Sequence, residues 1–140
     1  MTRRNQQGQQ QLRRAKKQVE QSLGAEQGRY RPPPREDCKP RQWETPIDDA
    51  PSIRVQYNIW RHKGCLVDFA INIQVLTAEA WETVESFDCC HGNCHYHPVN
   101  GEEPRPLAKL DVVGDVQHSY WQVESVIADR VRIIMGRVEG

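Results

Sequence analysis

Two stretches of alternating apolar and polar residues constrain the fold of this chain most strongly. Residues 52–60 (SIRVQYNIW) and 65–76 (CLVDFAINIQVL) place an apolar side chain at almost every second position. Successive side chains of a β-strand point to opposite faces, so each stretch is typical of a half-buried strand. The RHKG turn between them predicts an antiparallel hairpin. We expect its buried face to consist of Ile53, Val55, Tyr57, Ile59, Val67, Phe69, Ile71, Ile73 and Val75.

The residues that follow predict more strands and one helix. Residues 81–90 (WETVESFDCC) alternate more weakly and predict a third strand, and a fourth follows the next turn. From 115 to 135 the apolar residues step by three and four, as in an amphipathic helix, which we expect to end at Gly136. Trp81 and Trp121 are expected in the core. The predicted fold class is α+β: an antiparallel sheet of about four strands packed by one long C-terminal helix.

The first 42 residues differ in composition from the rest of the chain. They contain nine glutamines, four prolines and eleven Lys/Arg against four Asp/Glu, a net charge of +7, whereas residues 43–140 carry −7. A segment with so few large apolar residues cannot offset its ordering entropy by burial. We therefore predict a basic, largely disordered arm at 1–42, with a short helix at 9–24, followed by a compact domain at 43–140.

The basic residues of this arm suit contact with phosphates, and they predict RNA or DNA as a partner. The alternative is a solvated tail that keeps the protein in solution. Phosphate contact would make binding weaken steeply as salt rises, and a solvated tail would not bind at all. The residues concerned are Arg3, Arg4, Arg13, Arg14, Lys16 and Lys17.

Apolar runs and cysteine number bear on the compartment. No run in the sequence is long enough to cross a bilayer, and the N-terminus lacks the apolar stretch of a signal peptide. We therefore expect a cytoplasmic protein with no membrane partner. The odd number of cysteines, five, argues against a complete disulfide framework and favours reduced thiols.

Residues 88–97 (DCCHGNCHYH) hold three of the five cysteines and three of the five histidines. Gly92-Asn93 predicts a two-residue hairpin turn there, because both residues tolerate positive φ. That turn would place Asp88 opposite His97, where the carboxylate can orient the imidazole. One face of the hairpin would carry Phe87, Cys89, Cys94 and Tyr96, and the other would carry Asp88, Cys90, His95 and His97.

The polar face of this hairpin supports three interpretations, of which the first is catalytic. Two histidines on one face can act as general base and general acid in phosphodiester cleavage with no metal, provided that a cation stabilises the developing charge. Arg105, Lys109 or the RHK turn at 61–63 could supply this cation. The protein would then be a metal-independent ribonuclease whose arm holds the RNA. Its catalytic residues would be Asp88, His91, His95 and His97.

A metal site and a purely structural hairpin are the other two interpretations. Asp88, Cys90, His95 and His97 are all acceptable Zn²⁺ ligands, although the sequence lacks the paired C-x-x-C knuckles of a structural zinc module. Alternatively, the histidines face solvent in a non-catalytic binding or accessory protein. The sequence leaves the three interpretations open, and with them the question of whether the protein is an enzyme.

The stretch from 67 to 97 contains DFAINIQ, then W-x-x-V, then F-D-x-x-H-G-x-x-H-x-H. It resembles a group of small, uncharacterised bacterial and phage proteins. More distantly, it is similar to toxins of the TumE type from toxin–antitoxin pairs, although the arginine common before the aspartate in those toxins is absent here. The resemblance covers the body but not the arm. It implies a toxin-like or phage accessory protein with an antitoxin-like partner, and Asp88, His91, His95 and His97 as signature residues.

Overall fold

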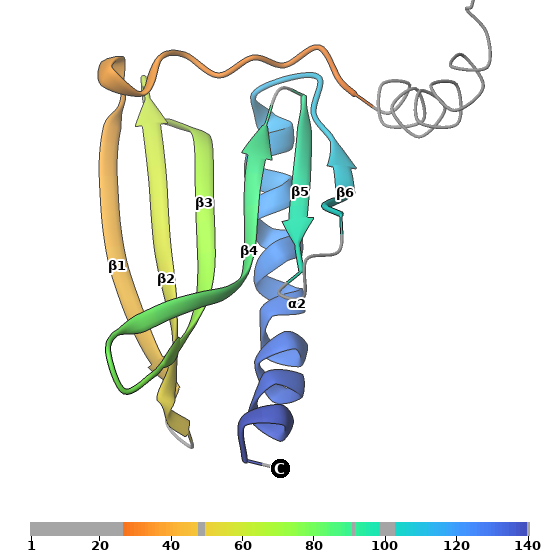
Figure 1. Ribbon diagram of the computed structural model, residues 1–140. Coiled ribbons are helices and arrows are strands. Elements are labelled where there is room, and N and C mark those ends of the chain that lie inside the picture. The colour runs from red at the N-terminus through yellow and green to blue at the C-terminus, as the bar shows by residue number, and fades with distance from the viewer. Residues whose placement is uncertain (1–26, 48–49, 91, 99–102, 140) are drawn as a thin grey trace, which may run out of the picture.

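The computed structural model describes residues 27–47, 50–90, 92–98 and 103–139. An antiparallel sheet of six strands, in the order β1-β2-β3-β4-β5-β6, packs against one long helix (Figure 1). This confirms the predicted antiparallel sheet with a C-terminal helix, but the sheet has six strands rather than about four. The elements are η1 (Arg35–Asp37), β1 (Lys39–Ile47), β2 (Ala50–His62), β3 (Cys65–Leu76), β4 (Trp81–Cys90), β5 (Asn93–His97), β6 (Arg105–Lys109) and α2 (Gly114–Glu139).

The two strands that the sequence did not predict are the edge strands β1 and β6. Pro40 and Pro46 lie in β1, and Pro106 lies in β6. Proline has no N–H to donate, so within a sheet it is tolerated mainly at an edge. It also makes an edge a poor template for pairing with another chain. Pro40, Pro46 and Pro106 therefore lie on the two edges of the sheet, where proline is tolerated.

The β2–β3 hairpin has the predicted buried face. Of the nine residues expected there, Val75 is half-buried and the other eight are buried. Val67 lies at a bulge outside the core cluster, and Leu66, which was not predicted, belongs to that cluster. Lys63 and Gly64 form the turn with φ of 52° and 81°, the positive values that a tight hairpin turn requires. This face packs against the apolar stripe of α2, which consists of Val116, Val123, Ile127, Val131 and Ile134.

Three sequence predictions about the helix and the tryptophans are wrong. Helix α2 does not end at Gly136 but continues to Glu139, so this glycine lies inside its last turns. Trp121 is 61 % exposed on the outer side of the helix. Trp81 lies under the guanidinium of Arg54, 4.3 Å from its ring centroid, and not in the core.

A β-bulge explains the position of Trp81. Ile73 pairs with Glu85 but Gln74 pairs with Thr83, so Val84 is an extra residue in β4. One extra residue reverses which face the following side chains point to. Residues of β4 on either side of Val84 therefore have opposite parity, and Trp81 points to the face opposite that of Phe87.

Residues 27–38, which we call the strap, cross one end of the sheet (Figure 1). The N–H of Gly28 donates to the carbonyl of Gly92 (2.9 Å), and the hydroxyl of Tyr30 donates to the carbonyl of Val67 (2.7 Å). The part of the predicted arm that the structure describes thus packs on the body, and β1 begins within it, at Lys39. The helix predicted at 9–24 and the six basic residues proposed for phosphate contact lie outside the described residues.

Within the described part of the chain, no helix combines the length and the apolar character that crossing a membrane requires.

Candidate functional site

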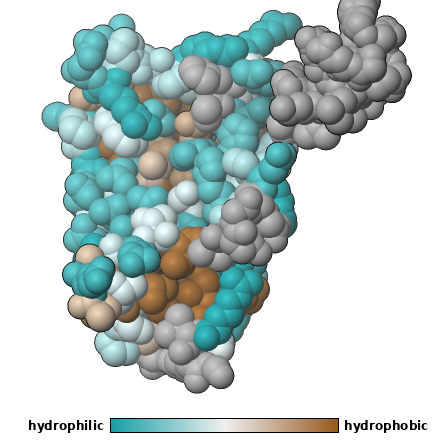
Figure 2. Space-filling view, in the orientation of Figure 1, coloured by the Kyte–Doolittle hydropathy of each residue, from teal (hydrophilic) through white to brown (hydrophobic). Residues whose placement is uncertain are grey.

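The sheet face turned away from α2 is polar, and we call it the open face. Figure 1 shows β4 and β5 in front of α2, and Figure 2 shows this side as largely hydrophilic, with an apolar patch in its lower half. Polar side chains on this face are hydrogen-bonded to one another: Asn72 Nδ2 donates to Gln56 Oε1 (2.8 Å), and Gln74 Nε2 donates to Thr83 Oγ1 (3.2 Å). The open face includes Gln56, Asn58, Asn72, Ser86, Asp88, His95 and His97.

The β4–β5 hairpin carries the histidines, and it turns one residue earlier than predicted. Cys90 pairs with Asn93, so the connection consists of residues 91 and 92, not of Gly92-Asn93. Asp88 is therefore directly opposite His95, and the predicted pairing of Asp88 with His97 is wrong. The turn moves by one residue, so the partner of each β4 residue moves by two positions along β5. Because side chains alternate between the faces, each one stays on the face that the sequence predicted.

The position of Gly92 accounts for this register. Its φ of 85° is one that side chains other than that of glycine rarely adopt. A Cβ at residue 92 would also lie 2.2 Å from the carbonyl oxygen of Gly28. Glycine thus allows both the turn and the close approach of the strap. Asn93 is left inside β5, where it pairs with Lys109 of β6.

Asp88 and His97 are joined across the two strands despite the changed register. His97 Nε2 lies 3.1 Å from Asp88 Oδ1, a diagonal contact between neighbouring strands. A carboxylate only accepts hydrogen bonds, so Nε2 carries a proton and Nδ1 is the nitrogen left for another partner. The side chains of His97 and Asp88 are 39 % and 34 % exposed, so both can be reached from solvent.

His95 lies beside this pair in a different environment. The ring centroids of His95 and His97 are 6.3 Å apart. Burial lowers the pKa of His95 below its ordinary value of 6.5, and the nearby His97 lowers it further, while the Asp88 carboxylate acts in the opposite direction. The two imidazoles are therefore unlike: His95 is neutral near pH 7, and His97 is held by a carboxylate.

A second charged pair joins the strap to the open face, and the sequence did not identify it. Arg35 Nε donates to Asp68 Oδ2 (3.0 Å), and the guanidinium lies 3.8 Å from the ring centroid of Trp60. Burial raises the pKa of Asp68, and Arg35 partly offsets this; the charge of Asp88 adds a smaller rise. Asp68 is the only charged residue in the alternating stretch CLVDFAINIQVL, and this could have marked it as a candidate site residue.

Several predicted site residues lie elsewhere or outside the described residues. The Arg105 guanidinium lies 5.8 Å from the ring centroid of Tyr96, a residue of the helix-side core, and Lys109 is 4.0 Å from Asp111. Neither is therefore positioned as the predicted cation beside the histidines. His91 and the side chain of Cys90 lie outside the described residues.

A metal site was the alternative prediction for the same hairpin. Among the residues that the structure describes, no three His, Cys, Asp or Glu side chains are grouped so that they could hold a metal ion. Asp88, His95 and His97 were three of the four residues of the predicted zinc set, and they do not form such a group. The fourth was Cys90, so the complete set stays a prediction.

Comparison with known proteins found no match: no family model, no curated protein and no solved structure is similar to this chain. The resemblance drawn from the histidine motif therefore stays a prediction. Function has to be inferred from the geometry of the open face.

Proposed function

We propose that the open face binds RNA and cleaves it by metal-independent acid–base catalysis at His95 and His97. The observation that carries this proposal is the 3.1 Å contact of His97 with Asp88, next to a second imidazole 6.3 Å away between ring centroids. A general acid or base acts over about 2.6–3.2 Å. Two rings at this separation are too far apart to share one proton, but each can reach a different oxygen of one phosphodiester.

The two histidines have different roles in this proposal. His95, neutral because burial lowers its pKa, takes the proton of the ribose 2′-hydroxyl. The 2′-oxygen attacks phosphorus, and the bond to the 5′-oxygen breaks. Protonated His97 donates its proton to that leaving oxygen, while Asp88 holds the ring and balances its charge. The products are a 2′,3′-cyclic phosphate and a free 5′-hydroxyl.

Two arginines stacked on tryptophans support RNA as the ligand. Arg35 lies over Trp60 and Arg54 over Trp81, with distances of 3.8 and 4.3 Å to the ring centroids. Planar cations supported by aromatic rings suit both phosphate contact and stacking on bases. Both pairs lie on the sheet face that carries His95.

The attachment point of the basic segment also supports RNA binding. Gly28, in the strap, bonds to Gly92 at the tip of the histidine hairpin. The described part of the chain begins at Gln27, next to Gly28, and the six basic residues named above precede it in the sequence. The positive charge of these basic residues would raise the local concentration of RNA near the hairpin.

The test uses the full chain, a short RNA and an excess of chelator. The wild-type protein should cleave the RNA, and His95→Ala and His97→Ala should each reduce the rate by about 10²–10⁴-fold. His118→Ala is the matched control, because His118 is exposed on α2, on the other side of the sheet, and its loss should leave the rate unchanged. Wild-type protein that leaves RNA intact, or cleavage that survives both hairpin variants, would contradict the proposal.

A further inference from the structure

Cys89 and Cys94 lie directly opposite each other on β4 and β5, with Cys94 buried and Cys89 half-buried. Cys90 and Asn93 close the turn next to them, and a turn is typically closed by a hydrogen bond between its first and fourth residues. The next pair along the ladder is then a non-hydrogen-bonded pair, whose Cα atoms lie about 4.5 Å apart. Disulfides span Cα separations of about 4.4–6.8 Å. The backbone is thus already placed for a bond between these two sulfurs.

We propose that Cys89 and Cys94 are a site of reversible oxidation, at which a disulfide joins β4 to β5. The bond would lie on the helix side of the hairpin, since Cys94 belongs to the core. It would fix the pairing of the strands next to Asp88 and His95 on the other side. The inference does not depend on the catalytic proposal, because it rests on the pairing of two thiols alone.

The reaction needs an oxidant, and we assign a peroxide to this role. One thiolate attacks the peroxide, which forms a sulfenic acid and releases one water after proton transfer. The second thiol attacks the sulfenic sulfur, the disulfide forms, and a second water leaves. Two thiols thus lose two electrons and two protons, and hydrogen peroxide is reduced to two waters. A thiol reductant reverses the change by exchange.

The surroundings of the two sulfurs set the order and the rate of these steps. Cys94 is 0 % exposed, whereas Cys89 is half-buried, so the peroxide reaches Cys89 first. The hydrogen bond with Cys94, together with burial, raises the pKa of Cys89, so its thiol is protonated at neutral pH. The thiolate is the reactive form. Oxidation should therefore be slow at pH 7 and faster at pH 9.

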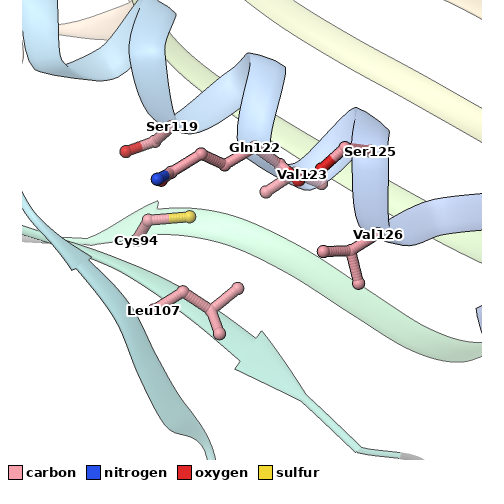
Figure 3. Close-up of a pocket in the computed structure, with 7 residues that line it drawn as sticks. All are labelled: Cys94, Leu107, Ser119, Gln122, Val123, Ser125 and Val126. Carbon is pink, nitrogen blue, oxygen red and sulfur yellow. Dashed lines mark hydrogen bonds between the residues drawn. The ribbon is translucent and has the colours of Figure 1, made fainter.

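A pocket beside Cys94 gives its side chain room to rotate. The pocket has a volume of about 310 Å³ and lies between α2 and the strands β5 and β6 (Figure 3). Figure 3 shows the Cys94 side chain between Leu107 and the helix residues Gln122 and Val123. A disulfide needs a Cβ–S–S–Cβ dihedral near about 90° in magnitude. Empty space beside one sulfur allows that rotation without displacing the core.

Two other described cysteines supply a matched control. Cys38 donates to the carbonyl of Pro34 (3.3 Å), and Cys65 is exposed at the start of β3, where it pairs with His62. Neither has a cysteine opposite it in the ladder of the described strands.

The test compares two full-chain variants after treatment with hydrogen peroxide. The first, Cys38→Ser/Cys65→Ser/Cys90→Ser, keeps the opposed pair. The second, Cys89→Ser/Cys90→Ser/Cys94→Ala, keeps Cys38 and Cys65. The first should lose about 2 Da, the mass of two thiol hydrogens, recover it with a thiol reductant, and react faster at pH 9 than at pH 7. The second should not lose 2 Da, although its exposed Cys65 thiol can gain oxygen.

The same measurement on the wild-type chain guards against variants that do not fold. Peptide mapping of oxidised, folded wild-type protein should place the bond between Cys89 and Cys94. A first variant that is folded by circular dichroism but keeps both thiols would overturn the inference. A wild-type disulfide at any other pair of cysteines would overturn it as well.

Discussion

The two faces of this sheet differ in what holds their side chains in place. On the face that α2 covers, Phe69 and Phe87 are 0 and 1 % exposed, and they are held by close packing. On the open face, the Asp88 and His97 side chains are about one-third exposed and are held by a hydrogen bond to each other. The covered face therefore supplies stability, and the open face supplies groups that can bind and react.

A buried charge on the covered face sharpens this contrast. Glu85 is 1 % exposed and accepts two hydrogen bonds from Arg130 of α2, of 2.7 and 2.5 Å. A bidentate pair of this kind satisfies the buried carboxylate and fixes the helix on the sheet. Asp88 on the open face is also a β4 carboxylate, but it stays accessible to a ligand. Two carboxylates three residues apart in one strand thus serve different purposes, because they point to opposite faces.

The largest expected effect compares adjacent residues of β4 that point to the two faces. Phe87→Ala removes a buried ring that lies 5.1 Å from the Tyr96 ring between centroids, and it should lower the free energy of unfolding by about 3–5 kcal/mol. Ser86→Ala changes the open face and should cost less than about 1 kcal/mol. Urea unfolding measures both. Equal decreases in the free energy of unfolding for the two variants would contradict the claim that the covered face supplies the stability.

A smaller effect separates the two hairpin turns. Gly64 and Gly92 have similar φ angles, 81° and 85°, so alanine at either position should cost about 1–2 kcal/mol of backbone strain. A Cβ at Gly64 meets nothing within 4 Å, whereas one at Gly92 would lie 2.2 Å from the Gly28 carbonyl oxygen. Gly92→Ala should therefore destabilise the protein more than Gly64→Ala in thermal unfolding. An equal decrease in melting temperature for both variants would contradict the close contact between the strap and the histidine hairpin.

The smallest effect is a pH dependence that belongs to the open face. The pKa of His95 in the folded protein lies below its ordinary value of 6.5, mainly because of burial. Below pH 6.5 the imidazole of His95 takes up a proton in the unfolded chain but not yet in the folded protein. The free energy of unfolding therefore decreases as the pH is lowered from 6.5 to the pKa of His95 in the folded protein. Urea unfolding of the wild type at pH 7.5 and at pH 5 should show this loss. His95→Asn should show a smaller one, and parallel curves for the two proteins would contradict the assignment.

The sequence predicted those parts of the fold that strict periodicity determines. Ile53, Phe69 and Ile71 alternate without interruption, so the faces of β2 and β3 followed directly. In β4 the bulge at Val84 reversed the parity, and no residue type marks such an insertion, so Trp81 was placed on the wrong face. The edge strands escaped prediction because their prolines are as typical of loops as of edges.

The candidate site was predicted in its composition but not in its pairing. His91-Gly92 and Gly92-Asn93 are both acceptable turns, and local sequence does not decide between them. The structure pairs Cys90 with Asn93, and the carbonyl oxygen of Gly28, distant in sequence, approaches residue 92. Asp88, His95 and His97 still share one face, because the pairing between β4 and β5 changes by two positions and side chains alternate between the faces with a period of two. The contact of Arg35 with Asp68 is long-range, so the charge in CLVDFAINIQVL marks Asp68 but does not identify its partner.

The central claim is that the open face uses a ribose 2′-hydroxyl as the nucleophile. The most direct test is the cleavage of an RNA and of the same oligonucleotide with a 2′-deoxy sugar at the scissile position, in chelator. We expect the RNA to be cut to a 2′,3′-cyclic phosphate and the deoxy substrate to stay intact. Cleavage of both substrates at equal rates, or of neither, would contradict it.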